Sequence, residues 1–190
     1  ALPISNAETA ALFNPMNGEC GEAKVRQVDG KTQVYLQLKS GESIILQTYR
    51  QPLQASKPWK YVKEQPFSLR LDHGWKLHFA ESKPEIQGTF DIDRPCSWTN
   101  IDHPAAQTNM GTGVYSLDIE LPALKADNWI LDLGDVRESA RVRINGQEAG
   151  CVWAVPYQLK VGQFLKPGKN HIEIEVTNLP ANRIAELDRQ

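Results

Sequence analysis

Segments in which apolar and polar residues alternate one by one recur along this chain and constrain its fold more than any other feature. Apolar residues occupy every second position from Ile172 to Val176, and the same pattern runs from Tyr115 to Leu121. A strand of this kind buries one face and exposes the other to solvent, which is typical of an antiparallel sandwich. The expected strands span residues 67–71, 75–79, 86–92, 114–121, 129–133, 137–144, 148–152, 157–161 and 171–177.

Turn signals separate these strands. Asn145-Gly146 is typical of a type I′ hairpin, and Pro167-Gly168 predicts a turn before the last strand. Eight or nine short strands in one body indicate a sandwich or jelly roll. Helix is expected only in short turns or at the end of the chain, where Ala181 to Asp188 could form two turns.

The first third of the chain predicts a separate, smaller unit. Residues 23–49 suggest a three-stranded meander whose first turn is Asp29-Gly30, and the alternation is lost from Gln51 to Pro66. We therefore expect a small antiparallel β unit at 1–52, the end of a preceding domain. A linker is expected at 53–66, and the sandwich at 67–190.

The charge balance and hydropathy exclude some partners. The 190 residues include 21 basic and 23 acidic side chains, a net charge of −2, which argues against a nucleic-acid or anionic-membrane partner. No stretch approaches the ~20 apolar residues of a membrane span, and no signal peptide is recognisable at Ala1. We expect a processed chain or a piece of a longer one.

No cofactor is expected. The three cysteines, Cys20, Cys96 and Cys151, lack metal-site spacing and are interpreted as small buried apolar residues, although one disulfide is possible in an exported protein. Asp91 and Asp93 resemble a fragment of an oxygen-rich calcium site, but a solvated edge is the favoured interpretation.

Two motifs carry a family resemblance. The segment 129–150 contains Ala-Arg-Val-Arg-Ile-Asn-Gly, and the segment 165–178 begins with Leu-Lys-Pro-Gly-Lys-Asn. Together they resemble the galactose-binding-like jelly roll of glycoside hydrolase family 2 enzymes. The ending from Val176 to Ile184 is similar to the C-terminal region of family 106 α-L-rhamnosidases, with Pro180 where an aromatic residue is usual. The segments 13–18 and 38–46 resemble the small β segment before that jelly roll.

The resemblance implies a function for the whole region. In such bacterial enzymes, which act on plant or host polysaccharide, the catalytic domain lies upstream of this region. The resemblance therefore implies a non-catalytic accessory region that packs against a catalytic domain of the same polypeptide and contacts carbohydrate. It also implies a periplasmic or extracellular location.

The residues themselves offer no catalytic group. Glycoside cleavage normally needs two facing carboxylates, whereas the acids of the predicted strands fall on wet faces. The histidines show no metal-ligand spacing, and the serines lack a nucleophile motif. The wet-face acids are Asp118, Glu120, Glu173 and Glu175, and the histidines are His73, His78, His103 and His171.

Aromatic residues in irregular segments are the candidate carbohydrate contacts. Trp98 lies between Arg94 and Gly113, while Trp153 and Tyr157 flank Val155-Pro156. Aromatic faces stack on the C–H faces of pyranose rings. Trp153 and Tyr157 could instead close the end of the sandwich or pack on another domain. We favour one of these two roles over contact with sugar. Arg137 and Glu138 could bind sugar hydroxyls, although an ion pair between them is favoured.

Three functions stay open. The first is the non-catalytic accessory region of a glycoside hydrolase. The second is a freestanding carbohydrate-binding module, which requires an exposed aromatic platform. The third is a small hydrolase, which requires two carboxylates converging in a pocket.

Overall fold

The computed structural model describes residues 2–4, 7–54, 56–63, 67–123, 126 and 128–189. The chain forms two compact units, Ala1–Ser68 and Leu69–Gln190, here called unit 1 and unit 2. Each unit has its own hydrophobic core.

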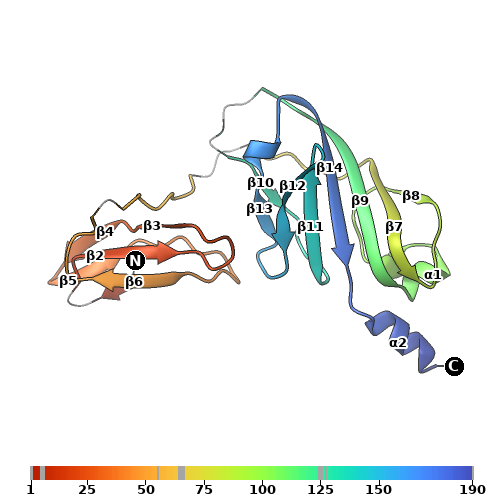
Figure 1. The fold of residues 1–190 in the computed structure, drawn as a ribbon, viewed down its shortest axis with the longest axis horizontal. Helices are drawn as coiled ribbons and strands as arrows, with labels where there is room; N and C mark the ends of the chain where they lie inside the picture. The colour runs from red at the N-terminus through yellow and green to blue at the C-terminus, as the bar shows by residue number, and fades with distance from the viewer. Residues whose placement is uncertain are drawn as a thin grey trace. The chain divides into compact units, whose positions relative to one another are not determined.

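Unit 1 consists of two three-stranded antiparallel sheets (Figure 1). The strand orders are β1-β5-β4 and β3-β2-β6. Ala10, Leu12, Ala23 and Val34 form its core. The strands are β1 (Leu2–Ile4), β2 (Thr9–Phe13), β3 (Cys20–Glu22), β4 (Val25–Val28), β5 (Lys31–Val34) and β6 (Ile45–Tyr49).

The predicted meander is only partly present. The hairpin between β4 and β5 is confirmed, with Asp29 and Gly30 at φ angles of 50° and 69°. The third strand, β6, pairs with β2 and not with β5. The reason is that β2, which the predicted meander did not include, is largely buried and forms the central strand of the second sheet.

Residues 56–63 differ from the expected linker because they pack on unit 1. The Glu22 amide donates to the Lys57 carbonyl at 2.7 Å, and the Trp59 amide donates to the Glu22 carbonyl at 2.8 Å. Trp59 and Tyr61 contact the unit 1 core. A Cβ at Gly21 would lie 2.7 Å from the Trp59 nitrogen, so only glycine allows this approach. Ala55 and residues 64–66 lie outside the described residues.

Unit 2 is built on a six-stranded antiparallel sheet in the order β12-β11-β14-β9-β7-β8, with a two-stranded sheet of β10 and β13 (Figure 1). The expectation of an all-β, sandwich-type fold is confirmed. The strands are β7 (Trp75–Lys83), β8 (Thr89–Ile92), β9 (Met110–Leu121), β10 (Ile130–Asp132), β11 (Ser139–Ile144), β12 (Gln147–Val152), β13 (Gln158–Lys160) and β14 (Gly168–Thr177). The helices are η1 (Trp98–Asn100), α1 (Pro104–Gln107), η2 (Gly162–Phe164) and α2 (Ala181–Leu187), and α2 confirms the expected terminal helix.

The predicted alternation sets which face of the sheet is buried. Trp75 and Leu77 of β7, Val142 of β11 and Ile174 of β14 all point into the core. The residues between them, such as Arg141 and His78, stay exposed. The core therefore lies on one face of the six-stranded sheet, and a polar face remains open.

Two predicted strands differ from the structure. Residues 67–71 carry no strand, and Phe67 and Leu69 are exposed. The segment predicted at 86–92 becomes a strand only at Thr89, after Gly88 turns the chain at a φ angle of 89°.

The two motifs that carry the family resemblance form one structural brace. The buried Asn170 side chain donates to the Lys166 and Gly168 carbonyls and accepts from the Lys166 amide, at 2.7–2.9 Å. Asn145, in the hairpin turn after β11, donates to the Asn170 Oδ1 at 2.9 Å and accepts from the His171 amide at 3.0 Å. These motifs therefore specify the fold.

All three cysteines are free thiols. Cys20 and Cys151 are exposed, so their interpretation as buried apolar residues is wrong, and Cys96 is half-buried. Cys151 lies on β12, an edge strand of the six-stranded sheet. It pairs with Arg141 of β11, so its side chain lies on the polar face of the sheet and is exposed.

Candidate functional site

Trp98 belongs to the core and not to a carbohydrate platform. Its side chain is 6% exposed and packs edge-on against Phe79, with ring centroids 5.0 Å apart. Its indole Nε1–H donates to the Tyr115 hydroxyl at 2.8 Å, and that hydroxyl donates to the Cys96 carbonyl at 3.2 Å. Burial raises the pKa of Tyr115 to about 12. The prediction that Trp98 contacts sugar is therefore contradicted, because its aromatic faces are covered.

Trp153 has the opposite environment. It follows β12 and is 64% exposed, the highest value among the large apolar side chains that the structure describes. Tyr157, at the end of the same loop, is half-buried and packs on the core. Trp153 is therefore exposed in this chain, and the interpretation as a plug does not hold for it.

Arg137 pairs with Asp135 and not with Glu138. The Arg137 Nη2 lies 2.9 Å from the Asp135 Oδ2, and both side chains are exposed. This hydrogen bond is the main cause of a raised Arg137 pKa, with smaller contributions from the nearby Glu138 and Tyr157. The Glu138 amide donates to the Thr177 carbonyl at 2.9 Å, which fixes the backbone at the start of β11.

Strand register brings these residues to one end of unit 2. Ala140 of β11 pairs with Val152 of β12 on one side and with Val176 of β14 on the other. The residues just beyond, Ser139, Trp153 and Thr177, therefore lie in the same row. The loops 133–138 and 153–157 and the end of β14 are here called the Trp153 end. It contains Arg137, Glu138, Trp153 and Tyr157, while Trp98 is enclosed in the core.

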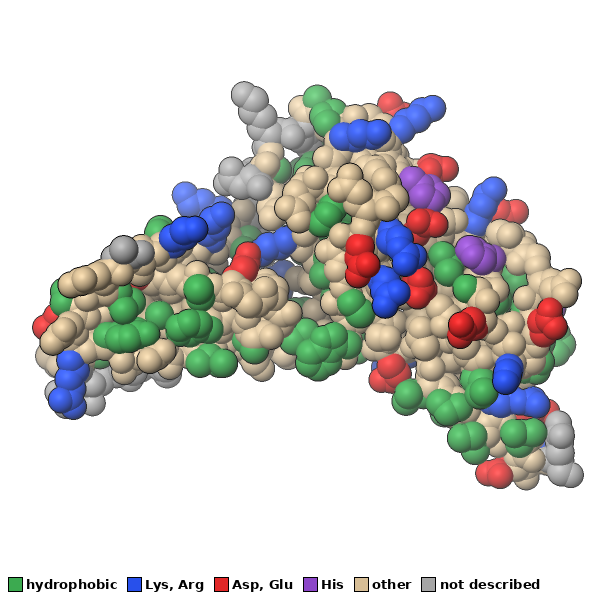
Figure 2. Space-filling view, in the orientation of Figure 1, with side chains coloured by type: hydrophobic (Ala, Val, Ile, Leu, Met, Phe, Trp, Pro, Cys, Tyr) green, Lys and Arg blue, Asp and Glu red, His purple; other side chains and the backbone are tan. Residues whose placement is uncertain are grey.

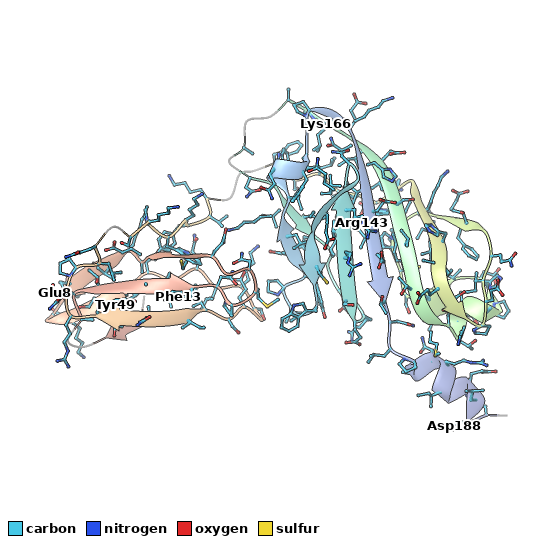
Figure 3. The ribbon with its side chains drawn as sticks, in the orientation of Figure 1. Glu8, Phe13, Tyr49, Arg143, Lys166 and Asp188 are labelled. Atoms are coloured by element: carbon cyan, nitrogen blue, oxygen red, sulfur yellow. The ribbon has the colours of Figure 1, made fainter. Side chains whose placement is uncertain are left out.

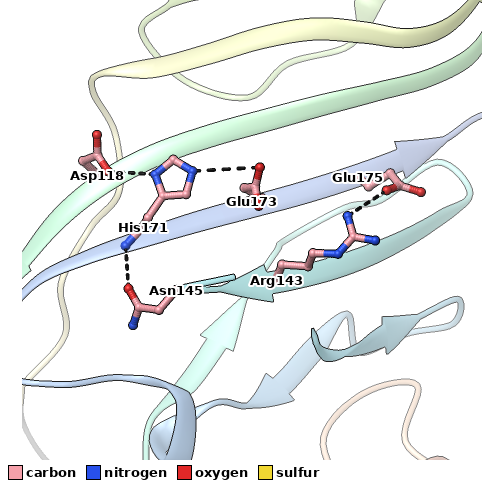
Figure 4. Close-up of polar contacts among 6 residues, drawn as sticks. All are labelled: Asp118, Arg143, Asn145, His171, Glu173 and Glu175. Atoms are coloured by element: carbon pink, nitrogen blue, oxygen red, sulfur yellow. Dashed lines mark hydrogen bonds and ion pairs between the residues drawn. The ribbon is translucent and has the colours of Figure 1, made fainter. Parts of the chain in front are cut away.

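Sequence reasoning missed a network of charges on the open face of the six-stranded sheet (Figure 4). The Arg143 Nη1 lies 3.3 Å from the Glu175 Oε2, and the Arg141 Nη1 lies 3.8 Å from the Glu175 Oε1. Figure 3 shows Arg143 projecting from β11 over this face. Strand register, which the sequence does not give, decides that these three side chains meet.

A histidine adds a second group of contacts to the same face. The His171 Nδ1 lies 2.7 Å from the Asp118 Oδ1, and its Nε2 lies 4.0 Å from the Glu173 Oε1 (Figure 4). Asp118 and Glu120 are exposed, while Glu173 and Glu175 are half-buried on this face. These acids stand on an open sheet and are not enclosed as an acid–base pair would be.

A pocket of about 200 Å³ lies at the other end of unit 2. Lys166, which lines it, and Asp188, beyond the Trp153 end, are at opposite ends of the unit (Figure 3). None of the described residues that line it is acidic, so it does not supply facing carboxylates. The lining consists of Leu121, Pro122, Ala126, Trp129, Gly162, Leu165, Lys166 and Pro167.

Among the residues that the structure describes, no group of three or more histidine, cysteine or acidic side chains is placed to hold a metal ion, and Asp91 and Asp93 are exposed. No described helix is both long and apolar enough to cross a membrane.

Comparisons with known proteins relate the chain to carbohydrate-cleaving enzymes. No known protein-family model matches it. A curated protein of Formosa agariphila, named "Putative beta-glucuronidase", is 32% identical over 126 residues, which is 65% of this chain and 11% of that protein. The chain thus spans about a tenth of the length of this relative.

The similar solved structures are also carbohydrate-cleaving enzymes, and one of them matches nearly the whole chain. A rhamnosidase from Novosphingobium sp. PP1Y is 25% identical, with a TM-score of 0.78 over 98% of this chain and 18% of the rhamnosidase. A β-glucuronidase from an uncultured Clostridium sp. is 19% identical, with a TM-score of 0.51 over 63% of this chain and 24% of that protein, and it supports the fold alone. The chain is therefore similar to regions of glycoside hydrolases.

Proposed function

We propose that this chain is a non-catalytic accessory region of a bacterial glycoside hydrolase acting on plant or host polysaccharide. In this proposal unit 2 is a galactose-binding-like jelly roll, and unit 1 is the small β unit before it, as in family 106 rhamnosidases. The observation that carries the proposal is the match of 98% of this chain to only 18% of a rhamnosidase. An exported, periplasmic or extracellular protein is part of the same proposal.

The arrangement of the acids supports a non-catalytic role. Glu173 and Glu175 are two residues apart on one face of β14. Glu175 is held by two arginines, and Glu173 lies beside His171. A glycosidase acid needs an apolar pocket that keeps it protonated, and these two stand on an open, cation-rich face.

The C-terminal helix supports a role in packing. Leu179, Ile184 and Leu187 are each more than half exposed, and no residue of α2 is buried. Figure 2 shows apolar side chains gathered over this helix. Apolar groups that cluster on a soluble protein usually mark a contact. We propose that α2 packs on a catalytic domain of the same polypeptide.

Turnover measurements on the isolated chain test the proposal. We expect no hydrolysis of aryl α-L-rhamnosides or aryl β-D-glucuronides by the purified 190-residue chain. Hydrolysis that survives repeated purification and disappears in Glu173→Gln or Glu175→Gln would favour a small hydrolase instead. Lys169→Gln, on the same strand, is the matched control and leaves any such activity unchanged.

A freestanding carbohydrate-binding module is the second candidate. The exposure of Trp153 favours it, because an exposed aromatic platform is what such a module requires. The two candidates share a non-catalytic chain and differ in whether α2 has a packing partner within its own polypeptide.

A further inference from the structure

The loop that carries Trp153 is held in a fixed shape by its neighbours. The Leu133 amide donates to the Tyr157 carbonyl at 2.9 Å, and the Gln158 amide donates to the Pro156 carbonyl at 2.8 Å. Val152, just before the loop, is buried in the core. A ring presented on such a support binds a ligand without first paying the entropy of ordering the loop.

Polar groups that suit a saccharide lie in the loop 133–138, at the same end of unit 2 as this ring. The register of these strands ends at the pair Ala140–Val152, so Trp153 follows the paired part of β12, and Arg137 stands three residues before Ala140 on the neighbouring chain segment. Asp135 orients the Arg137 guanidinium with two hydrogen bonds to its Oδ2, at 2.9 and 3.3 Å, and a guanidinium has five N–H donors in all. Hydrogen-bond donors and carboxylate acceptors at the same end as an exposed indole match the hydroxyls and the C–H face of a pyranose.

We propose that Trp153 is the stacking platform of a saccharide site, with Arg137 as a hydrogen-bond donor, and that the site takes a neutral pyranose. The inference rests on the proposed accessory role in a glycoside hydrolase. The choice of a neutral sugar follows from charge, because Asp135 and Glu138 in the loop 133–138, with Asp132 just before it at the end of β10, give three negative charges against one positive charge on Arg137. A uronate carboxylate would be repelled.

Two-dimensional ¹H–¹⁵N spectra of the chain test the site. The chain has five tryptophans, and the Trp153→Ala spectrum identifies the Trp153 indole N–H resonance. Methyl α-L-rhamnopyranoside should move this resonance with half-saturation at about 1–10 mM, the affinity expected for one stacked sugar. The enclosed Trp98 resonance should not move. Methyl β-D-glucuronide should bind at least about threefold more weakly, and added salt should reduce that difference.

Matched variants separate the platform from the donor. Trp153→Ala should abolish the shifts of neighbouring amides, and Arg137→Gln should weaken binding about three- to tenfold. Lys166→Gln, at the opposite end of unit 2, should leave binding unchanged. Folding of every variant is checked from the dispersion of the same spectra.

The outcomes separate this inference from the proposed function. Saturable shifts that centre on Trp153 and vanish in Trp153→Ala support the site. No saturable shift with any neutral pyranoside up to about 100 mM, or binding that survives Trp153→Ala, overturns it and leaves Trp153 to contact protein. Hydrolysis of an aryl glycoside by the same samples would instead overturn the proposed accessory role.

Discussion

Trp98 and Trp153 both lie in or beside irregular segments, yet one is enclosed and the other stands in solvent. The difference comes from position relative to the sheet. Trp98 fits over Gly113, where a Cβ would lie 2.8 Å from the indole, whereas Trp153 extends beyond the last register pair of β12. The sequence predicts aromatic residues in loops, but it does not give the strand register that decides which ring is covered.

The two tryptophans form a matched pair of variants. Trp98→Ala should lower the free energy of unfolding by about 3–5 kcal/mol, because it empties a core position and removes the N–H that donates to the Tyr115 hydroxyl. Trp153→Ala should change it by less than about 0.5 kcal/mol, as is usual for exposed sites. Urea denaturation followed by circular dichroism measures both. Similar losses in the two variants would contradict the assignment of Trp98 to the core.

Tyr115 predicts a stability change at alkaline pH. Its folded pKa is about 12, above the ordinary value of 10.0. Between these values the unfolded chain releases the phenol proton while the folded chain keeps it, so stability falls as pH rises. The loss should reach about 2–3 kcal/mol above pH 12 and be absent below pH 10.

Tyr115→Phe is the control for this pH dependence. Other groups titrate in the same range, so the difference between the wild type and Tyr115→Phe isolates the contribution of Tyr115. We expect the two unfolding free energies to converge between about pH 10 and 12, measured by urea titration at each pH. Parallel pH profiles would contradict the buried environment of this phenol.

At the scale of elements, the strands of unit 2 were largely predictable and their partners were not. Alternation and turn residues located most strands because each buries one face. Pairing depends on contacts between distant segments, which is why β6 was assigned to β5 although it pairs with β2. The charge network of Arg143, Glu175 and His171 was missed for the same reason, since its members come from different strands.

The hydrogen bonds of the brace around Asn170 predict that replacing this polar residue lowers the stability of the fold substantially. Asn170→Ala should lower the unfolding free energy by about 2–4 kcal/mol, because it leaves the Lys166 amide and carbonyl without their side-chain partner and removes one hydrogen bond of Asn145. Lys169→Ala, the exposed neighbour, should change it by less than about 0.5 kcal/mol. Chemical denaturation of both variants decides. An effect of Asn170→Ala as small as that of Lys169→Ala would contradict the structural role of the motif.

At the scale of the whole molecule, each unit encloses its own core. Unit 2 has an extensive core on its six-stranded sheet, so residues 69–190 should fold without unit 1. The fragment should unfold in one cooperative transition and keep the dispersed indole resonances of Trp98 and Trp153. Loss of cooperative unfolding in this fragment would show that unit 2 depends on unit 1.

Hydrogen–deuterium exchange tests the central claim, an accessory region packed within a larger glycoside hydrolase. Exchange of the α2 amides is measured in the isolated chain and in the polypeptide that its gene encodes, with the loop 153–157 as an internal reference. The account predicts that exchange in α2 slows by at least about tenfold in the longer polypeptide, because Ile184 and Leu187 become buried. The loop should exchange at the same rate in both. Equal exchange of α2 in the two proteins would contradict the account.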